Sequence, residues 1–171
     1  MKLSLIPSVL CILATVAGMT VIAQATISPK SNSLPSGVQK NLIAVGSLEQ
    51  SIHNQVNQYR RAQKLPPLAF DQTISEQARA HSAAMANSGR ISHNGFDDRA
   101  AAIGQTITYK SVAENVASNQ GYENPDNTAV KGWIKSPGHQ QNMVGDFDLT
   151  GIGVVEKGGS YYFTQIFLQK R

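Results

Sequence analysis

The sequence predicts an α+β fold in which helices come first and strands come mostly last. Apolar residues recur at helical spacing between residues 47 and 62, and again between residues 71 and 89. Two β-rich runs, LTGIGVVEK and SYYFTQIFLQK, occupy residues 149–157 and 160–170. Because the helical and β-rich segments are segregated along the chain, they favour an α+β layered domain over a doubly wound parallel sheet.

The first three helices are predicted from their end signals. A capping box, SLEQ, predicts that the first helix begins at Ser47 and runs to about Ala62. Asp71 is expected to cap the second helix, and Gly89 is expected to end it. The segment FDDRAAAIG predicts a short third helix before Gly104.

The second half of the chain holds one more predicted helix and the strands. The segment ITYKSVAENVASN is β-branched and irregular, which predicts a short strand that runs into a loop. Asp126 or Asn127 can cap a fourth helix, which Pro137 and Gly138 are expected to terminate. Residues 157–160 carry two glycines and are expected to join the last two strands as a β-hairpin.

The first 25 residues resemble a signal peptide. Lys2 gives a positive start, residues 3–23 carry no charge, and Ala23-Gln24-Ala25 offers the small residues that signal peptidase requires. Residues 26–41 are rich in Ser, Pro, Asn and Gly, and residues 26–46 are expected to form a flexible linker, which leaves residues 47–171 as the domain. We expect a secreted, periplasmic or other extracytoplasmic protein, whose one membrane contact would be an uncleaved leader.

Composition argues against a nucleic-acid partner. The net charge is +4, the Lys and Arg residues are scattered, and aromatic residues make up 6%, so no basic stripe with interleaved aromatics is present. The single cysteine, Cys11, lies in the leader. The domain is therefore expected to be held by its core alone, and no sequence feature indicates an oligomeric state.

Four histidines and one glutamate are candidates for a site. His53 flanks the first helix and His81 lies on the apolar face of the second, so both are expected to be packed or surface histidines. His93 and His139 are expected in loops that follow helices. Glu114 has apolar neighbours, so it points outward or is held by partners. Two imidazoles and a carboxylate can bind a divalent cation, share protons, or tie loops together.

From Ser47 to Lys170 the sequence resembles the CAP superfamily, which groups cysteine-rich secretory proteins, antigen 5 and pathogenesis-related proteins. It is most similar to the cysteine-free bacterial branch. The matching segments occur in family order: NQYRRAQKLPPLAFD, ARAHSAAMA, SH at His93, AEN at Glu114, WIKSPGHQQNM, GIGVV and YYFTQIF. The resemblance implies a three-layer α-β-α sandwich with a small, mostly antiparallel sheet (the CAP, or SCP, fold).

The resemblance also implies a cleft lined by two histidines and two glutamates, with zinc or another divalent ion bound in some members. His93 and His139 match the histidines, and Glu114 matches the first glutamate. Ser136 stands where the second glutamate is expected, so a bound cation would lose a nearby anion. The predicted metal ligands are His93, His139 and Glu114, and the predicted cofactor is zinc or another divalent cation.

Two functions follow from these residues. The resemblance favours a secreted, non-enzymatic module that binds a lipid, a sterol or another cell-envelope ligand. The alternative is a divalent-metal-dependent hydrolase, in which His93 and His139 hold the ion and Glu114 is the candidate general base. The chain contains no H-E-x-x-H motif and no evident nucleophile set. We therefore expect a binding protein rather than an enzyme.

Overall fold

A computed structural model of the chain describes residues 35–171, apart from the side chains of residues 41–43. Its sheet has four strands in the order β1-β3-β4-β2. These strands are β1 (Ala69–Phe70), β2 (Tyr109–Gln120), β3 (Leu149–Lys157) and β4 (Ser160–Lys170). Strand β1 pairs parallel with β3, and the other two pairings are antiparallel.

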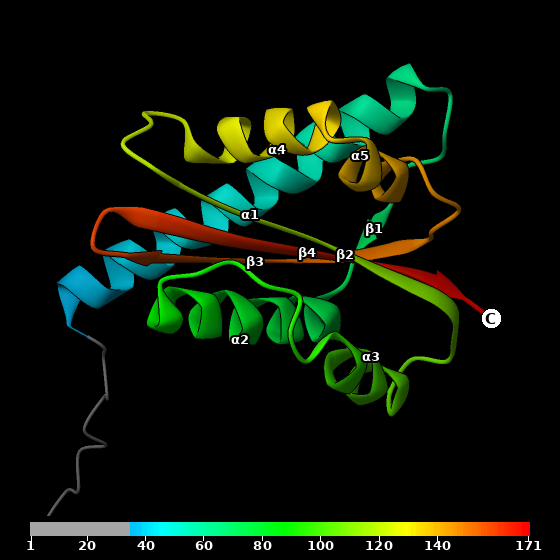
Figure 1. Ribbon diagram of the computed structural model, residues 1–171, viewed down its shortest axis with the longest axis horizontal. Helices are drawn as coiled ribbons and strands as arrows, with labels where there is room; N and C mark the ends of the chain where they lie inside the picture. Colours follow the sequence, from blue (N-terminus) through cyan, green and yellow to red (C-terminus); the bar gives the residue numbers. More distant parts are fainter. Residues whose placement is uncertain (1–34) are drawn as a thin grey trace, which may run out of the picture. The chain divides into compact units, whose positions relative to one another are not determined.

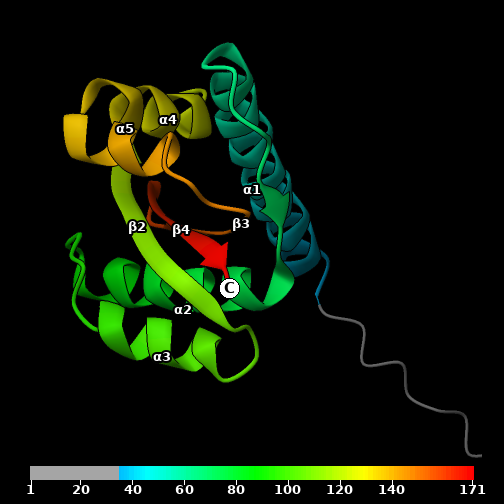
Figure 2. The same ribbon diagram turned by 90° about the vertical axis from the view of Figure 1, so that its right-hand side faces the viewer.

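Helices cover both faces of this sheet (Figures 1 and 2). One face carries α1 (Ser36–Ala62), α4 (Pro125–Lys135) and α5 (Pro137–Met143). The other face carries α2 (Gln72–Ser88) and α3 (Phe96–Gly104). The predicted α+β class and its three α-β-α layers are confirmed. Among the helices of residues 35–171, none combines the length and apolar character needed to cross a membrane.

The helix α2 begins and ends where the sequence predicts. Its N-cap Asp71 accepts a hydrogen bond from the Ile74 N–H at 3.0 Å, and Gly89 ends it in the left-handed conformation at φ 68°. The short helix predicted from FDDRAAAIG is α3. The predicted hairpin also forms, because Gly158 and Gly159 both take the positive φ that a tight two-residue turn requires.

Two glycines of β3 allow α2 to lie directly against the strand. A Cβ on Gly151 would lie 2.3 Å from the Ser75 backbone nitrogen, and a Cβ on Gly153 would lie 2.2 Å from the Arg79 backbone nitrogen. Backbone atoms cannot turn aside as side chains do, so only glycine permits this contact. The GIGVV segment thus sets how closely the helix layer approaches the sheet.

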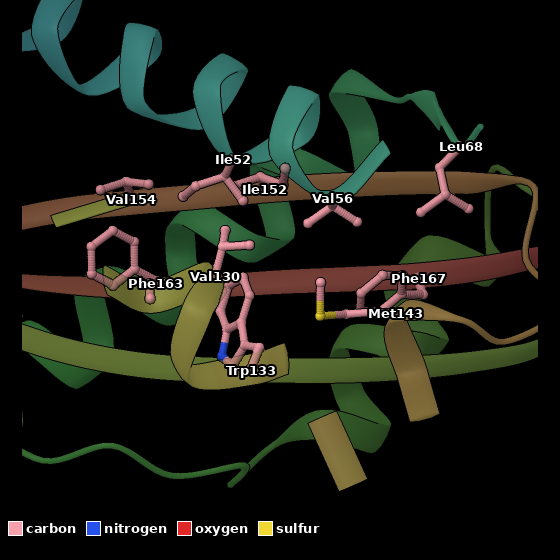
Figure 3. Close-up of a cluster of buried hydrophobic side chains, with 11 residues drawn as sticks. Ile52, Val56, Leu68, Val130, Trp133, Met143, Ile152, Val154, Phe163 and Phe167 are labelled. Atoms are coloured by element: carbon pink, nitrogen blue, oxygen red, sulfur yellow. The ribbon is translucent and has the colours of Figure 1, made fainter. Parts of the chain in front are cut away.

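The largest hydrophobic cluster lies between the sheet and the layer formed by α1, α4 and α5 (Figure 3). Its buried members are Ile52, Val56, Leu68, Ala129, Val130, Trp133, Met143, Ile152, Val154, Phe163 and Phe167. Within it, the indole N–H of Trp133 donates to the Val116 carbonyl on β2 at 3.1 Å. The tryptophan therefore anchors α4 both by packing and by a buried hydrogen bond.

Side chains complete the edge of β3 that the two-residue strand β1 leaves uncovered. The N–H of Ile152 donates to the Ser75 hydroxyl at 3.1 Å, and the N–H of Val154 donates to Glu49 Oε1 at 3.2 Å. Glu49 is buried and also accepts two hydrogen bonds from Arg79, at 2.8 and 2.6 Å. These bonds satisfy strand N–H groups that would otherwise be open to pairing.

The start of α1 differs from the prediction. The helix begins at Ser36, so the predicted helix start at Ser47 is wrong. Residues 36–46 of the expected linker are helical. The Ser47 hydroxyl donates to the Ala44 carbonyl at 2.6 Å, a bond that serine can make inside a helix. The predicted signal peptide and residues 26–34 of the predicted linker lie outside the described residues.

Two segments predicted as irregular are regular. Strand β2 pairs with β4 along its whole length, so VAEN lies on a strand at the sheet edge instead of entering a loop. Pro137 and Gly138 begin α5 instead of only ending α4, because proline is tolerated in the first turn of a helix. Glu114 therefore lies on an edge strand and His139 lies on a helix.

Candidate functional site

Glu114 is the centre of a buried charged cluster. It lies on β2 and its residue surface is 6% exposed. Arg99 on α3 donates to both of its oxygens, from Nε to Oε2 at 2.9 Å and from Nη2 to Oε1 at 2.8 Å. His93 Nδ1 lies 2.9 Å from Oε1, and because a carboxylate accepts, this nitrogen carries the proton. The cluster holds one anion between a guanidinium and an imidazole.

Arg99 is the residue of this cluster that the sequence did not reveal. It is 9% exposed, and its Nη1 also donates to the Asn94 carbonyl at 2.8 Å. A weak signal was available, since Arg99 is the one cation in FDDRAAAIG and Glu114 sits in an apolar run. A buried carboxylate requires a charged or hydrogen-bonding partner, but sequence alone does not show which cation meets it.

His81 is packed, as predicted. It is buried, and its Nε2 lies 2.7 Å from the Ser92 carbonyl, so Nε2 carries the proton. The same nitrogen lies 4.0 Å from Glu114 Oε1. Burial lowers the pKa of His81, an effect that outweighs the hydrogen bond to Ser92, and the charge of Arg99 lowers this pKa further. His81 is therefore an uncharged side chain near pH 7 that packs beside Glu114.

His53 is also structural, as predicted. Its Nε2 lies 3.0 Å from the Leu68 carbonyl, which also accepts from Asn57 at 3.0 Å. The ring packs edge-on against Phe70, with 5.4 Å between ring centroids. These contacts fasten α1 to the segment that leads into β1.

His139 approaches the same edge of β2 from α5. Its backbone carbonyl accepts from Asn115 Nδ2 at 3.1 Å, which holds α5 beside the residue that follows Glu114. Its ring Nδ1 lies 2.8 Å from the Ser136 hydroxyl, so the serine at the expected glutamate position contacts this histidine. Burial lowers the pKa of His139, and the nearby His93 lowers it further.

The structure therefore brings His93 and Glu114 into contact, and His93 acts on His139 by lowering its pKa. In the part of the chain that the structure describes, both rings form their side-chain hydrogen bonds through Nδ1, and neither Nε2 atom has a hydrogen-bond partner. Glu114 is already engaged by Arg99 and orients His93, as an outer carboxylate does in metal sites.

Metal binding itself stays a prediction. Within the part of the chain that the structure describes, no three His, Cys, Asp or Glu side chains gather closely enough to hold a metal ion. Closed structural zinc sites use four protein ligands, and catalytic sites use three. The described side chains by themselves form neither of these two kinds of zinc site.

A groove of about 300 Å³ lies between α1 and α4, the two helices that run side by side on one face of the sheet (Figures 1 and 2). Apolar atoms form most of its lining, which includes Tyr59, Ala62, Val130 and Ile134. The Tyr59 hydroxyl accepts from the Gln140 side chain at 2.7 Å, which ties α5 to α1. The sequence did not reveal this groove, because its walls come from segments about 70 residues apart.

Comparison with known proteins agrees with this architecture. The model of the CAP family, described as the cysteine-rich secretory protein family, matches residues 53–167. The uncharacterized protein YkwD of Bacillus subtilis is 33% identical over 136 residues, which cover 74% of this chain and 49% of that protein. An extracellular protein containing an SCP domain from Bacillus anthracis has a TM-score of 0.69 at 28% identity, covering 81% of this chain and 45% of that one.

More distant structures share the fold. An outer surface protein of Borrelia burgdorferi has a TM-score of 0.63 at 20% identity, and the match covers 73% of this chain and 94% of that one. The chain spans about half the length of its Bacillus subtilis and Bacillus anthracis relatives. With the family model matched along most of the described domain, the chain belongs to the CAP (cysteine-rich secretory protein) family.

Proposed function

We propose that this protein is an exported, non-enzymatic binding module that holds the acyl chain of a cell-envelope lipid in the groove between α1 and α4. The observation that carries the proposal is the mainly apolar lining of that groove. Its volume of about 300 Å³ lies at the lower end of small-molecule sites, which suits one chain. Export is supported by relatives whose names describe an extracellular protein and an outer surface protein.

The charged cluster around Glu114 gives less support to the alternative of a metal-dependent hydrolase. A general base must be free to take a proton from the reacting group. Glu114 accepts two charge-assisted hydrogen bonds from Arg99 and contacts His93, so it would have to leave these partners. We therefore assign Glu114 a positioning role towards His93.

Chain-length dependence tests the lipid proposal. Each methylene that enters an apolar site contributes about 0.8 kcal/mol, so affinity should rise from an eight-carbon to a twelve-carbon fatty acid and level off once the groove is filled. Displacement of a fluorescent fatty acid measures this series. An affinity that does not depend on chain length would contradict the proposal.

A matched pair of variants locates the site. Ile134 lines the groove, whereas Ile91 follows α2 in the layer on the opposite face and is 51% exposed. Ile134→Gln should weaken binding about fivefold, equivalent to roughly 1 kcal/mol of lost apolar contact, and Ile91→Gln should leave it unchanged. Equal effects of the two substitutions would remove the groove as the site.

Divalent-cation binding by His93 and His139 is a second candidate role, and the Nε2 atoms left over by the Nδ1 contacts support it. A calorimetric titration with zinc should give a binding heat that His93→Ala and His139→Ala each abolish. His53→Ala is the control and should retain the heat, since His53 lies on α1. Binding that survives in both His93→Ala and His139→Ala would exclude this pair as ligands.

A further inference from the structure

A polar pocket adjoins the apolar groove. It has a volume of about 280 Å³ and is lined by residues of the β2–α4 connection and of α4: Tyr122, Glu123, Asn124, Asn127, Thr128 and Lys131. We call it the Tyr122 pocket. Asn127 and Lys131 also line the groove, so the two hollows share a wall. Together they form one surface that is apolar along α1 and α4 and polar towards the start of α4.

The chemistry of the Tyr122 pocket suits hydroxyl groups. Asn124 and Asn127 each carry an amide that can both donate and accept, and the Glu123 carboxylate accepts. The Thr128 hydroxyl donates to the Asn124 backbone carbonyl at 3.1 Å, so the lone pairs of the Thr128 hydroxyl oxygen remain as acceptors. Tyr122 is 57% exposed and offers a flat apolar ring with a polar tip. A small polyol can satisfy these groups.

Lys131 marks the junction between the two hollows. It is exposed, and within residues 35–171 it takes part in no salt bridge. Its ammonium is a compact charge that suits a phosphate. Glu123 lines the pocket but not the groove, and its negative charge disfavours a phosphate there. The two charges together favour a phosphate at the junction rather than inside the pocket.

We propose that the ligand is a single-chain amphiphile whose phosphate contacts Lys131 and whose polyol headgroup occupies the Tyr122 pocket. This inference rests on the proposed function, because the acyl chain occupies the groove described above. Lysophosphatidylglycerol has this combination of one chain, one phosphate and a glycerol headgroup. Lysophosphatidylcholine has the same chain and phosphate, but its headgroup is cationic and carries no hydroxyls. Dodecyl maltoside has an uncharged sugar headgroup.

Calorimetric titration of the protein with these three probes, with twelve-carbon chains and below their micelle concentrations, tests the proposal. Lysophosphatidylglycerol should bind about two- to fivefold more tightly than lysophosphatidylcholine, because its glycerol headgroup can form hydrogen bonds in the Tyr122 pocket that choline cannot form. Lys131→Gln should weaken both lysophospholipids by about two- to fivefold, the range of a solvent-exposed ion pair, and leave dodecyl maltoside unaffected. Lys110→Gln, at an exposed lysine on β2, should change none of the three affinities. Tyr122→Ala should weaken the two probes whose headgroups carry hydroxyls and spare lysophosphatidylcholine.

The outcomes separate the two proposals. If Ile134→Gln weakens all three probes but wild-type protein binds the two lysophospholipids equally, the headgroup inference is wrong and the groove stands. The headgroup inference is also wrong if Lys131→Gln and Tyr122→Ala change no affinity. If Ile134→Gln changes none of the three affinities, the groove itself is not the site, and the proposed function fails with it.

Discussion

Removal of the Arg99 guanidinium should destabilise the domain strongly. Arg99→Met keeps the aliphatic stem but leaves Glu114, which is 6% exposed, with a hydrogen bond from His93 and with His81 farther away, at 4.0 Å. Breaking a buried pair by removing one partner costs about 3–5 kcal/mol, and the His93 contact places the expected loss near 3 kcal/mol. Domains have total stabilities of about 5–15 kcal/mol, so the loss is a large share of the whole.

Urea unfolding measures this loss, followed by the fluorescence of Trp133, the single and buried tryptophan. Arg90→Met is the matched control, because Arg90 is exposed, and it should change stability by less than about 0.5 kcal/mol. The double variant Arg99→Met/Glu114→Leu should be more stable than Arg99→Met alone, because no unpaired charge is left. A cost below about 1 kcal/mol for Arg99→Met, or a double variant less stable than the single, would refute the reasoning.

Two further predictions concern packing and pH. Gly153→Ala should lower the stability by about 1–3 kcal/mol or more in the same urea assay, because its Cβ would lie 2.2 Å from the Arg79 backbone nitrogen. Gly132→Ala, in open space on α4, should instead raise the stability by about 0.5–1 kcal/mol. Similar effects at both glycines would contradict the close contact between Gly153 and α2. His81 and His139 have folded-state pKa values below 6.5, so the unfolded chain binds more protons as the pH falls below 6.5 and stability should fall with it. The urea midpoint should be lower at pH 5.5 than at pH 7.5, and His81→Gln should reduce this difference. An equal reduction by the control His53→Gln would contradict the assignment of the pH dependence to His81.

Local signals in the sequence were enough to predict the elements whose ends depend on one or two residues. Asp71 caps the start of α2 and Gly89 ends it, as predicted, because capping and left-handed conformation are properties of single residues. The same kind of signal misled at Ser47, where an S-x-x-Q pattern lies inside α1. A capping box marks a helix start only if the preceding segment is not helical, and residues 36–46, which include Gly37 and Gly46, were expected to form a linker.

The candidate site was predicted only in part, for a similar reason. The sequence identified His93, Glu114 and His139, and the structure brings the first two into contact. It did not identify Arg99, which reaches Glu114 from a different element, 15 residues away. Nor did it place His139 on a helix, because Pro137 and Gly138 end one helix and begin the next. Contacts between elements depend on tertiary packing, which spacing along the chain does not encode.

The most direct test of the central claim is a titration of isotope-labelled protein with dodecanoic acid, followed by NMR chemical shifts. Acyl-chain binding between α1 and α4 predicts that the largest shifts cluster at Tyr59, Val130 and Ile134, with little change at His93 and Glu114. Shifts centred on His93 and Glu114, or no shifts at saturating fatty acid, would contradict the assignment of the groove as the binding site.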